Sequence, residues 1–544
     1  MNMHLSGIIQ RYLVAFGVLL ACYSCTNDAW DEHYGSNQNV KTTETLWDQL
    51  LKEDTLSQFR QLLDSVHITN GNKITSATYA DMLKKQYFTV FAPVNGSFNL
   101  DSLLSLRNTI EGYKKLEQRF IMSHLSRTPH SLSPYTNKMA LMMNGKYLVF
   151  RDSALSLVPL ITNKSNIVAA NGLIHSVSGQ IPFLPNIYEM LMDDSSFLDM
   201  GKYLFKYQKD SLDVLASIEA GIDENGETVF VDSVLIRKND LLKTFGYINS
   251  EDSLYRMIAP TKAGWDAAYT KVSSYFNYAY ITGSDSLKKY WTNHSLMKDL
   301  FFNWNLQKSP NDSIISTQYS NRTKDLHVFY NPFSAGGVLA GAEQVRVSNG
   351  LMYKVNTWPL DVEDVFFTPI TVEAENDKNI SALDPLLFNR YQRQKYADSI
   401  SAYGYLEVSP VKSTDKTDVT FYIPNTLSGK YDICVVLLPK TINSSALDLK
   451  PNKFTARVDY KTVTGAAAYV SCKGKVGENK AFFENKPTKV DTITLTTLAL
   501  PTCNYKQNKV TVTVRLQSIV TPKELTKYSH QMFIDCFYLK PRQD

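Results

Sequence analysis

The chain has 544 residues, which is more than one hydrophobic core fills and predicts three or four domains. Apolar residues make up 44% and charged residues 20%, so the composition is that of an ordinary globular protein. The net charge of +4 contains no Lys/Arg block, which argues against a nucleic-acid-binding protein. Six cysteines without recurring metal spacing argue against a zinc site and against a disulfide framework.

The first 25 residues have the features of an export signal. Arg11 supplies the positive charge, and the apolar run that follows it is about ten residues long, too short for a bilayer that needs about 20. The run ends in a Leu-Leu-Ala-Cys sequence that resembles a lipobox, whose cysteine is lipidated and becomes the new N-terminus. Cys22 is the preferred lipidation site, and Cys25 is the alternative, since the polar Thr-Asn-Asp that follows it resembles a surface-export tag. A cleaved signal peptide without lipid is the third interpretation.

Residues 26–41 are polar and predict a tether. Two motifs after it occur twice and in the same order. An apolar strand ending in Ala-Pro stands at 88–98 and again at 255–265, and an Asn-Gly hairpin sequence stands at 171–177 and again at 349–355. The order and similar spacing predict two copies of a domain of about 150 residues.

The motifs also predict local structure. The β-branched and aromatic run at 87–91 indicates a strand buried on both faces. Asn171-Gly172 is a strong hairpin signal. Apolar residues at three and four spacing predict packed helices over 45–63 and again over 187–204. Each copy is therefore expected to pack helices on a small sheet.

These two signatures resemble those of fasciclin-type domains. The resemblance covers residues 42–187 well and residues 188–368 more weakly, and 227–240 looks like an insertion in the second copy. Membership would imply adhesion or ligand binding and not catalysis. The motif that animal members carry as Tyr-His falls on Ser123-His124, so its tyrosine is missing and His124 is interpreted as structural. His175 shares a strand face with aliphatic residues and is likewise interpreted as a core histidine.

From residue 369 to 544 the pattern changes to short strands separated by turns, which predicts an all-β sandwich of jelly-roll type. The expected strands include 370–376, 403–410, 418–424, 430–439, 453–461, 509–519 and 532–541. The predicted fold class is therefore α+β, with two fasciclin-like domains followed by the sandwich.

The ends of this last region resemble those of galactose-binding-like jelly rolls, a class that includes many carbohydrate-binding modules. In some of them the acidic residues that match Glu373, Glu375 and Asp535 hold a structural calcium ion, and carboxylate oxygens suit that cation. Solvated carboxylates at a strand edge are the alternative. No other cofactor is expected.

The four C-terminal cysteines fall into two groups. Cys434 and Cys536 stand in apolar strand-like runs and are expected to be buried. Cys472 and Cys503 stand in segments that read as polar loops and could form a disulfide in an oxidising compartment.

The sequence has no nucleophile elbow, Walker loop, dinucleotide fingerprint or zinc-protease motif, so an enzyme is not expected. The whole chain resembles a fasciclin-domain surface lipoprotein of Gram-negative, glycan-utilising bacteria of Bacteroidetes type. That resemblance implies a lipid anchor in the outer membrane facing the exterior, a glycan ligand, and a TonB-dependent importer with its lipoprotein lid as partners. An adhesion protein that binds other proteins is the first alternative, and an undetected polysaccharide hydrolase is the second.

Overall fold

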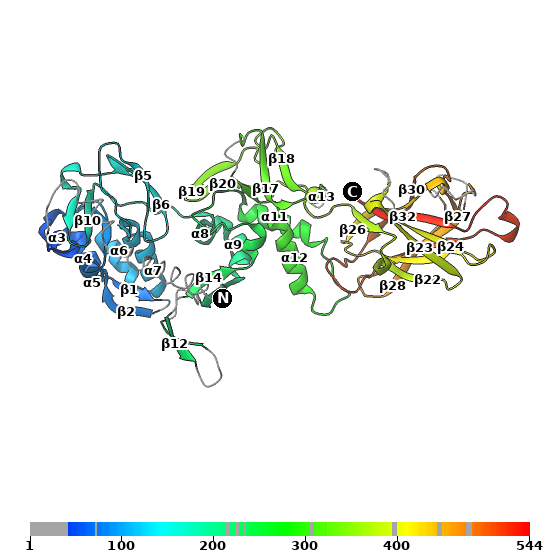
Figure 1. The fold of residues 1–544 in the computed structure, drawn as a ribbon, viewed down its shortest axis with the longest axis horizontal. Helices are drawn as coiled ribbons and strands as arrows, with labels where there is room; N and C mark the ends of the chain where they lie inside the picture. Colours follow the sequence, from blue (N-terminus) through cyan, green and yellow to red (C-terminus); the bar gives the residue numbers. More distant parts are fainter. Residues whose placement is uncertain are drawn as a thin grey trace, which may run out of the picture. The chain divides into compact units, whose positions relative to one another are not determined.

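The computed structural model describes residues 42–70, 73–212, 218–222, 228–232, 235–304, 309–320, 323–393, 400–442, 449–474 and 481–543. The predicted signal, tether and lipidation sites at Cys22 and Cys25 lie outside these residues. The described residues form two compact units, which are divided between Pro185 and Asn186 and are called unit 1 and unit 2 (Figure 1). Among the helices described, none combines the length and the apolar character needed to cross a bilayer.

Unit 1 mixes helices and small sheets. A central sheet has the order β4-β3-β10-β9, in which β3 and β10 are parallel, and a second antiparallel sheet has the order β5-β6-β7-β8. The helices are α3 (Leu46–Lys52), α4 (Ser57–Ser65), α5 (Tyr79–Lys85), α6 (Leu100–Ser105) and α7 (Ile110–Arg119). The strands are β1 (His67–Asn70), β2 (Lys73–Thr78), β3 (Phe88–Pro93), β4 (Leu125–Ser126), β5 (Asn137–Leu141), β6 (Tyr147–Arg151), β7 (Ala154–Leu155), β8 (Val158–Pro159), β9 (Ile167–Ala169) and β10 (Gly172–Val177).

The short sequence motifs in unit 1 form the strand, turn and helices that they predict, with one difference. Every residue of β3 is buried, as the apolar run indicates. The Asn-Gly turn joins β9 to β10 with Ala169 opposite Gly172. The predicted helix over 45–63 is present but broken, because Glu53 adopts an extended conformation and a 3₁₀ turn follows before α4 begins. A capping box at Thr45 starts α3.

The first part of unit 2 has the same kind of construction. Its six-stranded sheet has the order β18-β17-β16-β15-β20-β19, with β15 and β20 parallel. The helices are α8 (Ile187–Asp193), α9 (Leu198–Phe205), α10 (Leu241–Phe245), α11 (Lys262–Ser273), α12 (Asp285–Met297) and α13 (Val362–Val365). The strands are β11 (Gln208–Leu212), β12 (Ile218–Ile222), β13 (Thr228–Asp232), β14 (Leu235–Asn239), β15 (Tyr255–Pro260), β16 (Phe301–Asn303), β17 (Ser313–Tyr319), β18 (Leu326–Tyr330), β19 (Glu343–Val347) and β20 (Gly350–Val355).

The internal repeat is visible in equivalent contacts. Asn171 accepts a hydrogen bond from the Leu46 backbone N–H at the start of α3, at 2.7 Å. Asn349 accepts one from the Ile187 N–H at the start of α8, at 2.9 Å. Each asparagine side chain also donates to two backbone carbonyls. The glycine after each asparagine pairs with the first residue of the parallel partner strand, so both motifs perform the same structural task.

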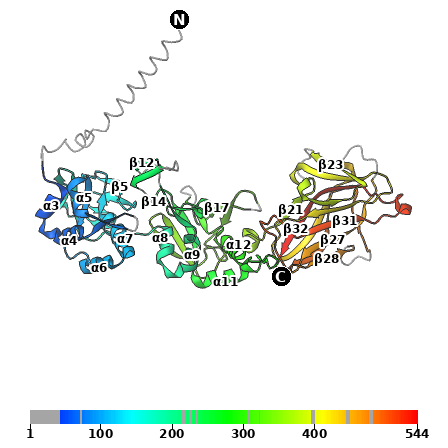
Figure 2. The same ribbon diagram turned by 90° about the horizontal axis from the view of Figure 1, so that it is seen from below.

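The last part of unit 2 is a β-sandwich, which confirms the predicted all-β architecture. One sheet has the order β23-β24-β32-β26-β30 with β21 beside β32, and the other has the order β22-β25-β31-β27-β28 with β29 beside β27. The sandwich is the yellow to red part of the ribbon in Figure 2. The rings of Phe421 and Phe537, one from each sheet, lie 4.8 Å apart in the shared core. The strands are β21 (Ile370–Glu373), β22 (Ile380–Leu383), β23 (Leu387–Arg393), β24 (Gly404–Pro410), β25 (Asp418–Tyr422), β26 (Gly429–Leu437), β27 (Lys453–Lys461), β28 (Ala467–Cys472), β29 (Phe483–Glu484), β30 (Asp491–Leu500), β31 (Thr513–Ser518) and β32 (Met532–Arg542).

The structure corrects the interpretation of two cysteines. Cys434 and Cys536 are buried in strands as predicted. Cys503 does lie in a loop, between β30 and β31, whereas Cys472 lies in a strand, and both are buried, free thiols. Cys472 is the last residue of β28, and its side chain turns into the sandwich core.

Candidate functional site

The structure brings together the acidic residues predicted to bind calcium. Glu373 ends β21, Asp535 stands in the paired strand β32, and ligand atoms of these two residues and of Cys536 lie within 4.8 Å of one another. Glu375 lies close enough for its charge to act on Asp535. Gly404 leaves room for it, since a Cβ on that glycine would meet the Glu375 carboxylate at 2.7 Å.

The electrostatics of this cluster fit a cation. Burial, with the charges of Glu373 and Glu375, raises the pKa of Asp535 to about 7. Burial also raises the pKa of Glu373, and its Oε2 atom has no hydrogen-bond partner among the described residues. Ser401 partly compensates by donating its hydroxyl to Glu373 Oε1 at 2.6 Å and its backbone N–H to Asp535 Oδ1 at 3.1 Å.

Clustered, partly desolvated carboxylates are the ligands that Ca²⁺ prefers, so Glu373, Glu375 and Asp535 could hold that ion. The sequence missed Cys536 as a neighbour. Its pKa is raised by burial and by the adjacent carboxylates, so the thiol stays protonated and does not suit a hard cation.

A second candidate site is the outward side of the sheet that contains β25, β31, β27 and β28. We call it the polar face. Most inward residues of these strands are apolar and buried, whereas most outward residues are polar and partly exposed. In register across the four strands lie Tyr422, Thr513, Asp459 and Tyr469 in one row, Thr420, Arg515, Arg457 and Ser471 in the next, and Asp418, Gln517 and Thr455 in a third.

The charges of the polar face are paired. Arg515 donates from Nε to Asp418 Oδ1 at 2.6 Å, and Gln517 donates to the other oxygen of Asp418 at 3.0 Å. Arg457 donates from Nε to Asp459 Oδ1 at 2.9 Å. Both arginines are thus fixed with their guanidinium groups partly exposed to solvent, with 38% and 42% of their side-chain surfaces accessible.

Two tyrosines stand at the ends of the row that contains Asp459. Tyr422 is 36% exposed on β25, and Tyr469 is 59% exposed on β28. With neighbouring strands about 4.8 Å apart, their backbones are separated by about 14 Å. The guanidinium of Arg457 lies 4.0 Å from the centre of the Tyr469 ring and covers one of its faces. The polar face therefore offers aromatic surface and fixed hydrogen-bonding groups side by side.

The histidines considered in the sequence are structural. His175 is fully buried, stacks on Phe91 with ring centres 5.3 Å apart, and donates from Nε2 to the His130 carbonyl at 2.7 Å. His124 is also buried and donates from Nδ1 to the Phe120 carbonyl at 2.8 Å. Burial lowers the pKa of each to about 4, so both are neutral near pH 7.

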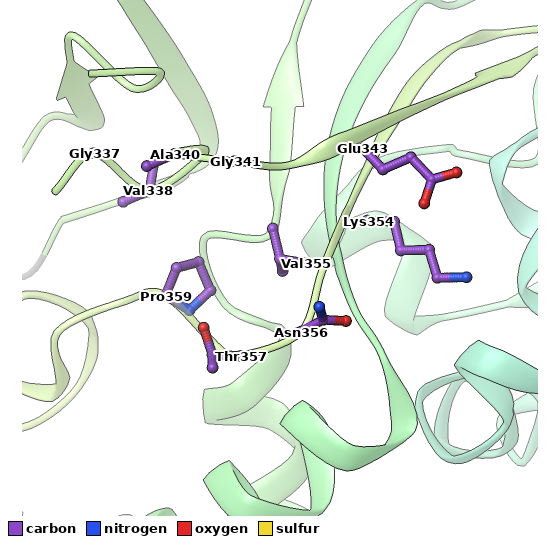
Figure 3. Close-up of a pocket in the computed structure, with 10 residues that line it drawn as sticks. All are labelled: Gly337, Val338, Ala340, Gly341, Glu343, Lys354, Val355, Asn356, Thr357 and Pro359. Carbon is purple, nitrogen blue, oxygen red and sulfur yellow. The ribbon is translucent and has the colours of Figure 1, made fainter. Parts of the chain in front are cut away.

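A pocket of 430 Å³ lies at the end of β20, between the loop at 337–341 and the segment at 355–359 (Figure 3). Glu343 and Lys354 stand opposite each other on β19 and β20, and both line it. Lys354 Nζ is 3.4 Å from Ser196 Oγ. Glu343 and Lys354 carry opposite charges and the rest of the described lining is small or apolar apart from Asn356 and Thr357, so this lining does not favour one ligand class.

Neither a family model nor a curated protein matches the sequence. Solved structures match part of the chain. The CBM22-1 xylan-binding domain from Paenibacillus barcinonensis Xyn10C is 9% identical, covers 32% of this chain and 94% of its own, and gives a TM-score of 0.20. A family 35 carbohydrate-binding module from Clostridium thermocellum is 10% identical over 32% of this chain and 99% of its own, with a TM-score of 0.19.

A third match, Paenibacillus xanthan lyase, is 11% identical over 44% of this chain and 21% of its own, with a TM-score of 0.20. The chain also spans 28% of a Clostridium thermocellum xylanase chain that combines CBM22-1 and GH10 modules. At these identities and TM-scores the matches carry no conclusion about a ligand, and the β-sandwich is established by its own strand pairing.

Proposed function

We propose that this protein is a non-catalytic glycan-binding protein whose ligand lies on the polar face. The observation that carries the proposal is the row that places Tyr422 and Tyr469 on either side of Asp459. Sugar rings present apolar faces and hydroxyl edges, and exposed tyrosines beside fixed polar groups complement both. A binding site needs no groups that react with the ligand. The carboxylates of Asp418 and Asp459 are each paired with an arginine, which favours ligand recognition over proton transfer.

The paired charges also indicate the class of glycan. Arg515 with Asp418, and Arg457 with Asp459, leave these central positions without excess charge. A strongly acidic polysaccharide would need unpaired cations, so the polar face favours a neutral polysaccharide.

Around this site we propose the wider setting that the sequence indicates. The chain is a lipoprotein anchored in the outer membrane, facing the exterior, and associated with an outer-membrane glycan importer and its lipoprotein lid. Its α/β domains, at residues 42–187 and 188–368, are fasciclin-like, and the region 369–544 is a galactose-binding-like domain. The support is the lipobox-like sequence, the repeated motifs and the strand order of the sandwich.

Affinity electrophoresis of the full chain in gels containing xylan, starch or polygalacturonate tests the ligand proposal. We expect a neutral polysaccharide to retard the protein, and Tyr469→Ala to weaken its binding about tenfold or more. Tyr330→Ala is the matched control, since Tyr330 is 74% exposed elsewhere in the same unit. Equal retardation of the Tyr469→Ala and parent chains would contradict the proposal, as would retardation by polygalacturonate alone.

One observation favours adhesion as a second candidate. On the outward side of the β5–β6 hairpin in unit 1, Leu141 lies opposite Tyr147 and Met139 opposite Val149. Met139, Leu141 and Tyr147 are 53%, 40% and 41% exposed. An apolar ladder on the surface is typical of protein-binding surfaces. Protein capture that survives Tyr469→Ala but is lost in Leu141→Ser would support this role.

A further inference from the structure

The connection between α11 and α12, residues 274–284, lies against the end of the β-sandwich. Asn277 is bonded twice to one sandwich turn: its carbonyl accepts from the Cys503 backbone N–H at 2.9 Å, and its side-chain amide donates to the Pro501 carbonyl at 2.8 Å. Backbone and side chain of one residue are thus fixed to the same turn. The 274–284 connection is therefore attached to the sandwich in a defined register.

Aromatic rings close the same junction. Tyr278 is almost fully buried and donates its hydroxyl to the Tyr505 carbonyl at 3.0 Å. A chain of ring contacts, with centres 4.8 to 5.9 Å apart, crosses from α12 into the sandwich through Trp291, Tyr505, Phe276, Phe366, Tyr275 and Phe367. Such contacts add stabilisation beyond the area they bury. The ring contacts and the two hydrogen bonds of Asn277 together hold the turns at this end of the sandwich in place.

Tyr280 extends the junction to the polar face. Its hydroxyl donates to the Cys503 carbonyl at 3.0 Å. Its Cβ lies 3.6 Å from the position that a Cβ on Gly465 would take, so it packs directly on the turn that joins β27 to β28. Thr502, next to Cys503, donates its hydroxyl to the Lys461 carbonyl at the end of β27, at 2.9 Å.

The β27–β28 hairpin is the part of the polar face that is least held by neighbouring strands. Asp459 and Tyr469 stand opposite each other a few residues from Gly465, and β28 pairs with β27 alone among the strands described. A hairpin at the edge of a sheet is its most readily opened part. Tyr280 supports this edge from outside the sandwich.

We propose that Tyr280 of the second α/β domain is a positioning residue for the glycan site, because it fixes the β27–β28 hairpin that carries Tyr469 and Arg457. The glycan half of this inference depends on the proposed function, whereas the ordering of the hairpin does not. The second α/β domain then contributes to glycan binding by ordering the hairpin, and does not only separate the other domains.

Hydrogen exchange and polysaccharide retardation of the full chain test the inference. We expect Tyr280→Ala to increase exchange at residues 461–472 several-fold and to weaken glycan binding about fivefold. Tyr280→Phe keeps the ring and loses only the hydroxyl bond to the Cys503 carbonyl, so it is expected to cause a smaller part of both changes. The exposed Tyr330→Ala variant, in the same unit, is expected to change neither.

Unchanged protection of 461–472 in Tyr280→Ala overturns the inference. Increased exchange together with unchanged glycan affinity overturns the functional half and leaves the glycan proposal standing. Should the parent chain bind no polysaccharide, the proposed function fails, and the exchange measurement still decides whether Tyr280 orders the hairpin. Calorimetry distinguishes a local effect from global loss of unit 2, which would lower the unfolding temperature and raise exchange throughout that unit.

Discussion

Asp535 shows how strongly one carboxyl group depends on its neighbours. The folded state raises its pKa to about 7 from an ordinary value of 3.8 and therefore favours the protonated form. Without a cation, the stability that this group contributes is greatest below its unfolded pKa and is lost as the pH rises through about 7. A cation binds the ionised form and removes that penalty, so Ca²⁺ should matter most where the carboxyl is ionised.

We therefore expect Ca²⁺ to raise the unfolding temperature of unit 2, with a larger increase at about pH 8 than at about pH 5. At 100-fold excess over its Kd the ion would contribute about 2.7 kcal/mol. Asp535→Asn removes the charge, and should abolish both the calcium effect and this pH dependence. The exposed Asp325→Asn is the control. Calorimetry that shows the same calcium shift in Asp535→Asn would refute the assignment.

At the scale of elements, the parallel pair of β3 and β10 depends on a glycine. Gly172 has φ +149°, and a Cβ there would lie 1.9 Å from the Phe88 carbonyl oxygen of the neighbouring strand. Gly350 stands in the same relation to Tyr255, at 1.8 Å. Close approach of the two backbones, and not only an unusual φ, excludes any side chain at these two positions.

Gly172→Ala should consequently destabilise unit 1 by more than about 3 kcal/mol, or prevent its folding. Gly145→Ala is the matched control, because Gly145 also has a positive φ, +81°, but open space where the Cβ would lie. That substitution should cost about 1 to 2 kcal/mol. Urea unfolding measures the loss of stability in each variant. Equal losses would show that the positive φ alone, and not the close approach of the backbones, explains the need for glycine at residue 172.

The sequence predicted those features whose residues and structural consequence lie within the same short segment of the chain. Asn171-Gly172 makes its own turn, and the apolar run at β3 identifies its own burial. The acidic cluster was found because β21 and β32 stand at the two ends of a recognisable region. The polar face was not predicted, because Tyr422 and Tyr469 become row neighbours only through strand register. Cys472 was misassigned because Ser471 and Lys473 make a strand end resemble a loop.

For the whole molecule, the proposed anchor gives a direct prediction. If acyl chains on Cys22 or Cys25 hold the protein to the membrane, changing both residues to Ser should move it from the membrane to the soluble fraction. Each single variant then identifies the modified cysteine, since only one of them should release the protein. Fractionation and metabolic labelling with a fatty acid measure both. A double variant that remains with the membrane would contradict the anchor.

The short strand β21 has a mechanical consequence. The chain enters the sandwich through it directly after α13, and its four residues pair antiparallel with the middle of β32, from Ile370 opposite Leu539 to Glu373 opposite Cys536. Tension along the chain therefore loads these hydrogen bonds together, in shear, instead of opening them one at a time. A cation bound by both Glu373 and Asp535 would lie at the far end of that strand, where it would resist the sliding of β21 along β32. The force needed to separate β21 from β32 by pulling on a bound polymer would therefore be greatest when the cation is bound.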